Sequence, residues 1–234
     1  MPPQPMRASR IGLLIRSQFL SRAALQRLSR NGKHGPGERQ IGSAIGWCKN
    51  AVSVSTYDPW RNANGGPALS IARNDHVLAL VARYPRPGAG KTRLARTLGP
   101  SAAYDLYCAF LRDLNERLAA GPWDLCWLYT PEHEPFAGWI GSDRLTRPQA
   151  GETLNERLGN GMRMLLAAYG RAIIMSTDSP HVPPAWLAQG FTLLDWYDIV
   201  LGPCRDGGYY LVGMRQPHDV FTGVTMSTST VLEE

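Results

Sequence analysis

The stretch from His76 to Leu94, HVLALVARYPRPGAGKTRL, constrains the fold more than any other part of this chain. Its apolar beginning, residues 76–82, is long enough to form a strand that is buried on both faces. A loop with two prolines and two glycines follows, and Lys91-Thr92-Arg93 then leads into a helical pattern. Because glycine lets backbone N–H groups approach oxygen atoms and the start of a helix favours negative charge, this strand–loop–helix unit is typical of phosphate binding.

The loop departs from the P-loop of nucleoside triphosphatases. Gly90-Lys91-Thr92 matches the end of the GxxxxGK[ST] pattern, but the first glycine of that pattern falls at position 85, where the chain has a proline without a backbone N–H. We therefore favour a different nucleotide-binding loop. A surface turn that carries solvated cations is the remaining alternative.

Downstream of this unit, apolar segments of strand length alternate with segments of helical period. Ser101 can cap one helix, and Thr153 with Glu156 forms a capping box at the start of another. The expected buried stripe of the second helix is Leu154, Leu158, Met162, Leu166 and Tyr169. The alternation predicts an α/β domain with a mostly parallel sheet, in which ligands bind beyond the carboxyl ends of the strands. The expected strands are residues 76–82, 123–130, 145–149, 171–176, 198–203 and 209–214, and helices are expected to start near residues 91, 101, 153 and 184.

Charged side chains lie in three loops that follow expected strands. The first loop offers Lys91 and Arg93, and the other two offer Asp178 and Asp206. Two carboxylates holding Mg²⁺ or Mn²⁺ beside two cations would suit a nucleotide diphosphate, because the metal and the cations share the phosphate charge. Each aspartate also has a purely structural interpretation. Asp178 could cap the helix that follows it, and Asp206, which precedes Gly207, could serve a hairpin turn.

The basic character of the chain belongs to its front end. The whole sequence has a formal charge of +6, but residues 1–74 hold eleven Lys and Arg against two acidic residues, so residues 75–234 are net negative. No nucleic-acid-binding face is therefore expected on the main domain. Because no apolar run approaches the roughly 18 residues that span a bilayer, no membrane span is predicted either.

Residues 1–74 are predicted to be a poorly ordered extension to a main domain of residues 75–234. Between residues 11 and 28, apolar residues recur with helical spacing among arginines, as in the amphipathic helix of an organelle transit peptide. Residues 29–74 are rich in Gly, Asn, Ser and Pro without a sustained period, which predicts loop or disorder. The four cysteines are scattered, which fits a reducing compartment better than a disulfide framework.

Four segments, in order along the chain, resemble the motifs of one bacterial family. Residues 85–94 are similar to its P-x-P-G-x-x-K-T-R-L loop, and Asp178-Ser179-Pro180 is similar to its D-S-P strand end. Residues 202–213 resemble G-P-x-x-D-G-G-Y-Y-L-x-G. Residues 149–157 resemble Q-x-G-x-L-G-E-R, with one more residue between Gly151 and Leu154 and with Asn155 in place of the second glycine. The family consists of glycosyltransferase-like proteins of the nucleotide-diphospho-sugar transferase (GT-A) superfamily and is related to phospholactate guanylyltransferases.

The resemblance implies a GT-A-like three-layer sandwich with a mostly parallel mixed sheet. It also favours a cytoplasmic location, with an organelle as the alternative if residues 1–30 are a transit peptide. It implies that Lys91 and Arg93 contact the diphosphate and that Asp178 lies near the metal and the ribose. The complete implied set is Lys91 and Asp206 as catalytic residues, Asp178 and Asp206 as metal ligands, and Arg93, Gly88, Gly90, Gln149, Asn155, Arg157, Gly207 and Gly208 as substrate-binding residues.

The family usually continues beyond position 234 to an acidic segment that can help to bind metal. Residues 227–234 are therefore expected to be the start of a helix in a truncated domain. The expected function is a nucleotide-sugar-dependent glycosyltransferase that uses a divalent metal and an unidentified small-molecule acceptor, with Asp206 or His181 as a candidate base. One alternative is a nucleotidyltransferase that uses a nucleoside triphosphate and expels pyrophosphate, and another is a non-catalytic nucleotide-binding remnant.

Overall fold

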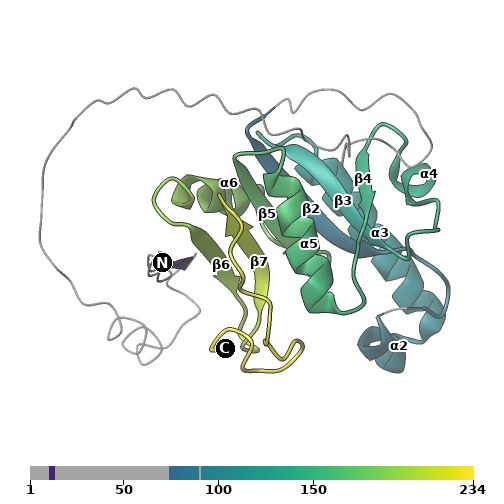
Figure 1. The fold of residues 1–234 in the computed structure, drawn as a ribbon. Helices are drawn as coiled ribbons and strands as arrows, with labels where there is room; N and C mark the ends of the chain where they lie inside the picture. The colour runs from purple at the N-terminus through teal and green to yellow at the C-terminus, as the bar shows by residue number, and fades with distance from the viewer. Residues whose placement is uncertain (1–10, 14–73, 90) are drawn as a thin grey trace, which may run out of the picture. The chain divides into compact units, whose positions relative to one another are not determined.

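A computed structural model of the chain describes residues 11–13, 74–89 and 91–234. These residues contain one mixed sheet of seven strands in the order β1-β6-β7-β5-β2-β3-β4 (Figure 1). Strand β7 is antiparallel to both of its neighbours, and the other neighbouring pairs are parallel. The strands are β1 (Ile11–Leu13), β2 (His76–Arg83), β3 (Asp124–Thr130), β4 (Leu145–Pro148), β5 (Arg171–Ser176), β6 (Ile199–Pro203) and β7 (Tyr209–Met214).

Helices cover both faces of the sheet (Figure 1). A Cβ atom built on Gly161 would lie 3.8 Å from Ile174, whereas one built on Gly190 would lie 3.0 Å from Ile173. Because successive residues of a strand point to opposite faces, the helices that carry these two glycines lie on opposite faces of the sheet. The helices are α2 (Thr92–Leu98), α3 (Pro100–Leu118), α4 (Phe136–Ile140), α5 (Leu154–Leu166) and α6 (Pro184–Leu193), with Gly161 in α5 and Gly190 in α6.

The centre of the core is the predicted apolar strand β2. Its residues Val77, Leu78, Ala79 and Leu80 are fully buried, which confirms the expectation of a strand covered on both faces. On the face that carries α6, the core also includes side chains of α3 and α4. The observed architecture is therefore the α/β sandwich with a mostly parallel mixed sheet that the sequence predicted.

Two details of the helices differ from the prediction. Helix α3 begins at Pro100 with Gly99 as its N-cap, so Ser101 does not cap it. In α5 the predicted capping box of Thr153 and Glu156 is present, but Leu154 is 41% exposed. Leu154 is the first residue of α5, directly after the N-cap Thr153. The predicted positions Leu158, Met162 and Tyr169 are buried, together with Gly161 and Leu165, whereas Leu166 is only partly buried.

The two ends of the chain also differ from the prediction where they are described. Ile11–Leu13, expected at the start of an amphipathic helix, form strand β1 and pair with Ile199–Leu201 of β6. The rest of that expected helix and the expected disordered stretch lie outside the described residues. Residues 227–234 form consecutive turns rather than the start of a helix. The described helices include none that is long and apolar enough to cross a membrane.

The topology sets which loops can meet. Strands β2, β5 and β6 all run in the same direction, since β7 is antiparallel to both β5 and β6. Their carboxyl ends therefore share one edge of the sheet, where Figure 1 also shows α2 and the C-terminus. The loops that follow them are residues 84–91, 177–183 and 204–208, which carry the predicted site.

Candidate functional site

The loop between β2 and α2 is built around a tight turn. The N–H of Ala89 donates a hydrogen bond to the carbonyl of Arg86 (3.1 Å), and Gly88 has a φ of 73°. Proline at the second position, here Pro87, and glycine with a positive φ at the third are typical of a type II turn. An L side chain is strained at this φ, so the turn requires Gly88 even though no atom lies within 4 Å of the position of a Cβ.

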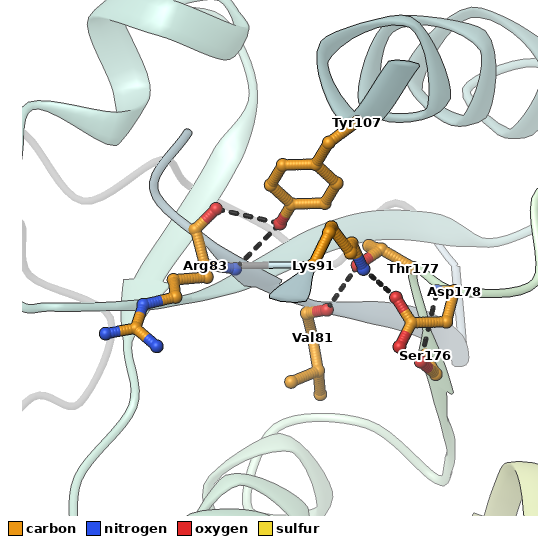
Figure 2. Close-up of polar contacts among 7 residues, drawn as sticks. All are labelled: Val81, Arg83, Lys91, Tyr107, Ser176, Thr177 and Asp178. Carbon is orange, nitrogen blue, oxygen red and sulfur yellow. Dashed lines mark hydrogen bonds and ion pairs between the residues drawn. The ribbon is translucent and has the colours of Figure 1, made fainter. Parts of the chain in front are cut away.

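Lys91 brings this loop to the end of β5. It is the N-cap of α2 in a left-handed conformation, with φ 48° and ψ 39°, and its side chain is only 18% exposed. Its ammonium forms an ion pair with the carboxylate of Asp178, and its Nζ lies 4.4 Å from the centre of the Tyr107 ring (Figure 2). The structure therefore joins one predicted cation to one predicted carboxylate.

Hydrogen bonds to β2 fix both sides of this contact (Figure 2). The hydroxyl of Tyr107, on α3, accepts a hydrogen bond from the N–H of Arg83 (3.0 Å) and donates one to the carbonyl of the same residue (2.8 Å). The hydroxyl of Thr177, directly before Asp178, donates to the carbonyl of Val81 (3.0 Å). The end of β2 is thus tied to α3 on one side and to the Asp178 loop on the other.

Burial sets the protonation chemistry of the contact. It lowers the pKa of Lys91 to about 8, because the charged ammonium loses water. The neighbouring Asp178 carboxylate favours the charged form, so the ammonium persists at neutral pH. Burial raises the pKa of Tyr107, which keeps the phenol neutral and able to donate to the Arg83 carbonyl. A protonated lysine in a partly desolvated place is a strong anion ligand.

Asp206 occupies a different kind of turn, between β6 and β7. The N–H of Cys204 donates to the carbonyl of Gly208 (2.8 Å), and the N–H of Gly208 donates to Oδ1 of Asp206 (3.2 Å). The carboxylate is exposed and takes part in the hairpin turn, which is the structural interpretation that the sequence left open for it. A role for Asp206 in binding or catalysis stays a prediction.

The last residues of the chain lie directly over this turn. The N–H of Leu232 donates to the carbonyl of Gly207 (2.9 Å), and a Cβ on Gly207 would lie 1.8 Å from the carbonyl oxygen of Ser229. With a φ of 87°, Gly207 is required both by the backbone conformation and by the approach of this segment. The predicted substrate-binding glycines Gly207 and Gly208 thus have structural partners within the chain.

Three other predicted substrate-binding residues donate to backbone carbonyls. The amide of Gln149 donates to Leu128 (2.8 Å) and Ala82 (3.3 Å), which ties the end of β4 to β3 and β2. Asn155 donates to Val224 (2.8 Å) and also to Phe221, so this departure from the family motif holds the segment that follows β7. Arg157 donates to the carbonyls of Gly151 (2.9 Å) and Glu152 (3.0 Å).

The remaining predicted residues do not join the contact between Lys91 and Asp178. Arg93 is exposed on α2, and it makes no hydrogen bond or ion pair with the residues that the structure describes. Gly90 lies outside the described residues. His181, the second candidate base, is exposed in the loop before α6.

The carboxylates at this edge fit a divalent cation only in part. Among the described residues, no group of three or more His, Cys, Asp or Glu side chains is placed to hold a metal ion. Asp178 and Asp206 follow β5 and β6, which β7 separates, so their strands are about 10 Å apart. Mg²⁺ often takes one or two carboxylates and completes its shell with waters and substrate phosphates. The 68% exposed Asp178 suits that kind of site.

Two partners of the site were not predicted from the sequence. Tyr107 lies on an apolar helical face, where a tyrosine is indistinguishable from an ordinary core residue. Glu134 lies in the loop between β3 and α4, is 5% exposed and forms an ion pair with Arg86 of the glycine loop. In the sequence it is one of two glutamates in a short loop, Glu132 and Glu134, and nothing in that pattern indicates a partner in another loop.

Comparison with known proteins places the chain among bacterial proteins of this fold. The sequence profile of a family described as an uncharacterized protein conserved in bacteria (DUF2064) matches residues 113–228, which include Asp178 and Asp206. A protein from Desulfovibrio desulfuricans G20, provisionally described as a nucleotide-diphospho-sugar transferase, is 32% identical with a TM-score of 0.65. The alignment covers 68% of this chain and 73% of that chain.

Other similarities are more distant. A 4-diphosphocytidyl-2C-methyl-D-erythritol synthase from Anaerococcus prevotii DSM 20548 is 10% identical with a TM-score of 0.43, over 68% of this chain and 82% of that chain. A search of curated proteins gave no significant match. The relation to phospholactate guanylyltransferases stays a prediction. On the strength of the 32% identical relative and the profile match, the chain belongs to the DUF2064 family and has the α/β fold of nucleotide-diphospho-sugar transferases.

Proposed function

We propose that the chain is a nucleotide-sugar-dependent glycosyltransferase that binds the diphosphate of its donor at Lys91. The observation that carries this proposal is the ion pair between the partly buried Lys91 ammonium and the exposed Asp178 carboxylate at the carboxyl edge of the sheet. Ligands of open α/β sheets bind at this edge. The description of the 32% identical Desulfovibrio protein as a nucleotide-diphospho-sugar transferase supports the same class of activity.

The unequal burial of the two partners suggests how a donor would bind. The Lys91 side chain is 18% exposed and the Asp178 side chain is 68% exposed. Water can therefore solvate the Asp178 carboxylate when the ion pair breaks. A diphosphate would replace Asp178 as the partner of Lys91, and the released carboxylate would bind Mg²⁺ or Mn²⁺. The bound cation would neutralise part of the diphosphate charge. The ion pair of the free protein thus keeps both groups in place for the ligand.

In the transfer step, negative charge grows on the departing nucleoside diphosphate. The Lys91 ammonium, partly shielded from water and held over the Tyr107 ring, would stabilise that charge more than a fully solvated lysine could. Asp206 is proposed to face the acceptor. One of its oxygens accepts from Gly208, and the carboxylate has further lone pairs with which to accept a proton from an acceptor hydroxyl.

The proposal is tested with UDP-, GDP- and CDP-sugars, each with and without Mn²⁺. Binding is followed by melting temperature, which a ligand of the folded state raises by mass action, and turnover is followed by release of nucleoside diphosphate. Lys91→Met is the control variant. Release of pyrophosphate from a nucleoside triphosphate would assign the protein to the nucleotidyltransferases instead. Binding without turnover would identify a non-catalytic remnant, and absence of any binding would reject a nucleotide site.

A further inference from the structure

A pocket adjoins Lys91 on the side of α3. It is lined by Arg86, Gly88, Lys91 and Thr92 from the loop and the start of α2, and by Tyr104 and Tyr107 from α3, among others. One small space is therefore bordered by the cationic side chains of Arg86 and Lys91 and by the hydroxyl groups of Thr92 and Tyr104. Such a lining suits an anion with several oxygen atoms, because cations and hydroxyl groups can each donate to it.

The second cation of this pocket is Arg86, whereas the sequence motif pointed to Arg93. Arg93 is exposed on α2 and does not line the pocket, although Thr92 directly before it does. Arg86 stands at the first position of the type II turn, whose hydrogen bond to Ala89 fixes its backbone. The turn therefore presents Arg86 beside Lys91.

A buried carboxylate orients Arg86 from the other side. Nη2 of Arg86 donates to Oε1 of Glu134, whose side chain is 95% buried, while the Arg86 side chain remains 58% exposed. Since a guanidinium has five N–H donors in a fixed plane, one can bind Glu134 while others stay available to a ligand. His133 lies 3.5 Å from the same Glu134 oxygen. The backbone of Glu134 is itself held by hydrogen bonds to Pro131 and Phe136.

Building on the proposed function, we propose that Arg86, oriented by Glu134, is the second cation that binds the donor's phosphate groups, in the role expected of Arg93. Arg86 and Lys91 border one pocket and are each held by a carboxylate from a different loop, Glu134 and Asp178. The ligand class is a pyrophosphate group, either free or within a nucleotide. Glu134 is a positioning residue, because it acts only through the guanidinium.

The experiment measures the affinity for inorganic pyrophosphate and for the nucleotide sugars by titration calorimetry, with melting temperature as a check on folding. Removing Arg86 alone would leave Glu134 buried without its partner and destabilise the protein. The test variant is therefore the double substitution Arg86→Met with Glu134→Gln, and Arg93→Met is the matched control. We expect the double variant to weaken pyrophosphate binding about tenfold or more and the control less than about twofold.

The single substitution Glu134→Gln separates positioning from charge. If Glu134 only neutralised Arg86, its removal would free the positive charge and tighten pyrophosphate binding. If it orients the guanidinium, affinity falls by about threefold or more although the charge near the ligand becomes more positive. Arg86→Lys keeps the positive charge but lacks the planar guanidinium, so it should also lower the affinity for pyrophosphate by about threefold or more. Tighter binding by Glu134→Gln would overturn the positioning role.

The outcomes also separate this inference from the proposed function. If the wild-type protein binds pyrophosphate through Arg86 but no nucleotide sugar, the pocket assignment stands and the proposed function fails. If nucleotide sugars bind and Arg93→Met weakens them more than the Arg86 double variant, the function stands and the pocket assignment fails. If neither ligand binds the wild-type protein, both are overturned.

Discussion

Two glycine-containing turns lie at the same edge of the sheet and hold their charged residues in opposite ways. The turn of residues 86–89 is followed by Lys91, which is partly buried, lies over the Tyr107 ring and is paired with Asp178 from another loop. The turn of residues 204–208 contains Asp206, whose exposed carboxylate accepts a hydrogen bond from its own backbone two residues on. The Lys91 ammonium is positioned by elements that are distant in the sequence, whereas the Asp206 carboxylate is positioned by its own turn.

The difference indicates which turn is organised for a ligand. Holding a partly desolvated ammonium opposes stability, so a fold retains one where its charge is used. An aspartate in a hairpin turn satisfies a local need of the backbone and requires no other explanation. The Lys91 contact therefore carries the proposal for binding, and Asp206 remains the weaker assignment.

The largest expected effect is on ligand binding. Lys91→Met should weaken the binding of a nucleotide sugar, or of pyrophosphate, by about 100-fold, because a partly desolvated ion pair with a phosphate is lost. Asp206→Asn keeps the oxygen that accepts from Gly208 and should change affinity by less than about threefold. Calorimetric titration of the two variants measures both. Equal losses of affinity in the two variants would mean that both turns contribute equally to ligand binding, which would contradict the contrast between them.

The next effect is on stability and compares Gly88 with Gly207. Both have positive φ, but a Cβ on Gly88 meets no atom within 4 Å, whereas one on Gly207 would lie 1.8 Å from the backbone of Ser229. Gly88→Ala should therefore lower the free energy of unfolding by about 1 kcal/mol through backbone strain alone. Gly207→Ala should lower it by about 2–3 kcal/mol, since the C-terminal segment must also move.

Denaturant unfolding of both variants, with shared m-values as the check on two-state behaviour, tests this pair. A loss for Gly207→Ala no larger than that for Gly88→Ala would mean that residues 225–234 move away from the turn at little cost.

Six of the seven described strands could be predicted, most of them because they are short apolar runs separated by clear turn signals, whereas β1 was expected to lie in a helix. Residues 171–176 and 209–214 were predicted with the bounds of β5 and β7, and the Gly207 turn indicated the hairpin. Contacts that depend on the end of an element were less predictable. Leu154 fits the helical period but is the first residue of α5, and the turns of residues 227–234 depend on contacts with the distant residue Gly207.

The site was predictable where its residues directly follow predicted strands, and not where they come from other segments. Lys91 and Asp178 could be brought together because each follows a parallel strand, and β2 and β5 are neighbours in the sheet. Tyr107 and Glu134, the other residues that contact Lys91 and Arg86, could not be predicted. Tyr107 has the pattern of a core residue, and Glu134 lies in a loop without period. Periodicity indicates which face of an element is buried, but not which loop residues meet across the edge of the sheet.

The pH dependence of binding sharpens the contrast between the turns. The pKa of Lys91 is lowered to about 8 by burial, so the protonated fraction falls about tenfold between pH 7 and pH 9. Affinity for pyrophosphate should fall by up to that factor over the same range, and the fall should be absent in Lys91→Met. Asp206→Asn should leave the pH profile unchanged. A wild-type profile that is flat to pH 9 would show that the ammonium is not the ligand.

The smallest expected effect is on the stability of the same variant. Lys91→Met should raise the free energy of unfolding at pH 7 by about 1 kcal/mol, because an apolar side chain replaces a desolvated ammonium and the 68% exposed Asp178 regains water. The folded-state pKa of about 8 lies below the usual lysine pKa of 10.5, so the unfolded chain binds more protons between those pH values. Wild-type stability therefore rises with pH in that window, and the advantage of Lys91→Met should shrink from pH 8 to pH 10.5.

Asp206→Asn should show no such change, since its turn hydrogen bond survives the substitution. A variant that is less stable than the wild type at pH 7 would mean that the ion pair with Asp178 outweighs the desolvation of Lys91, and the contact would then be a structural link between β2 and β5.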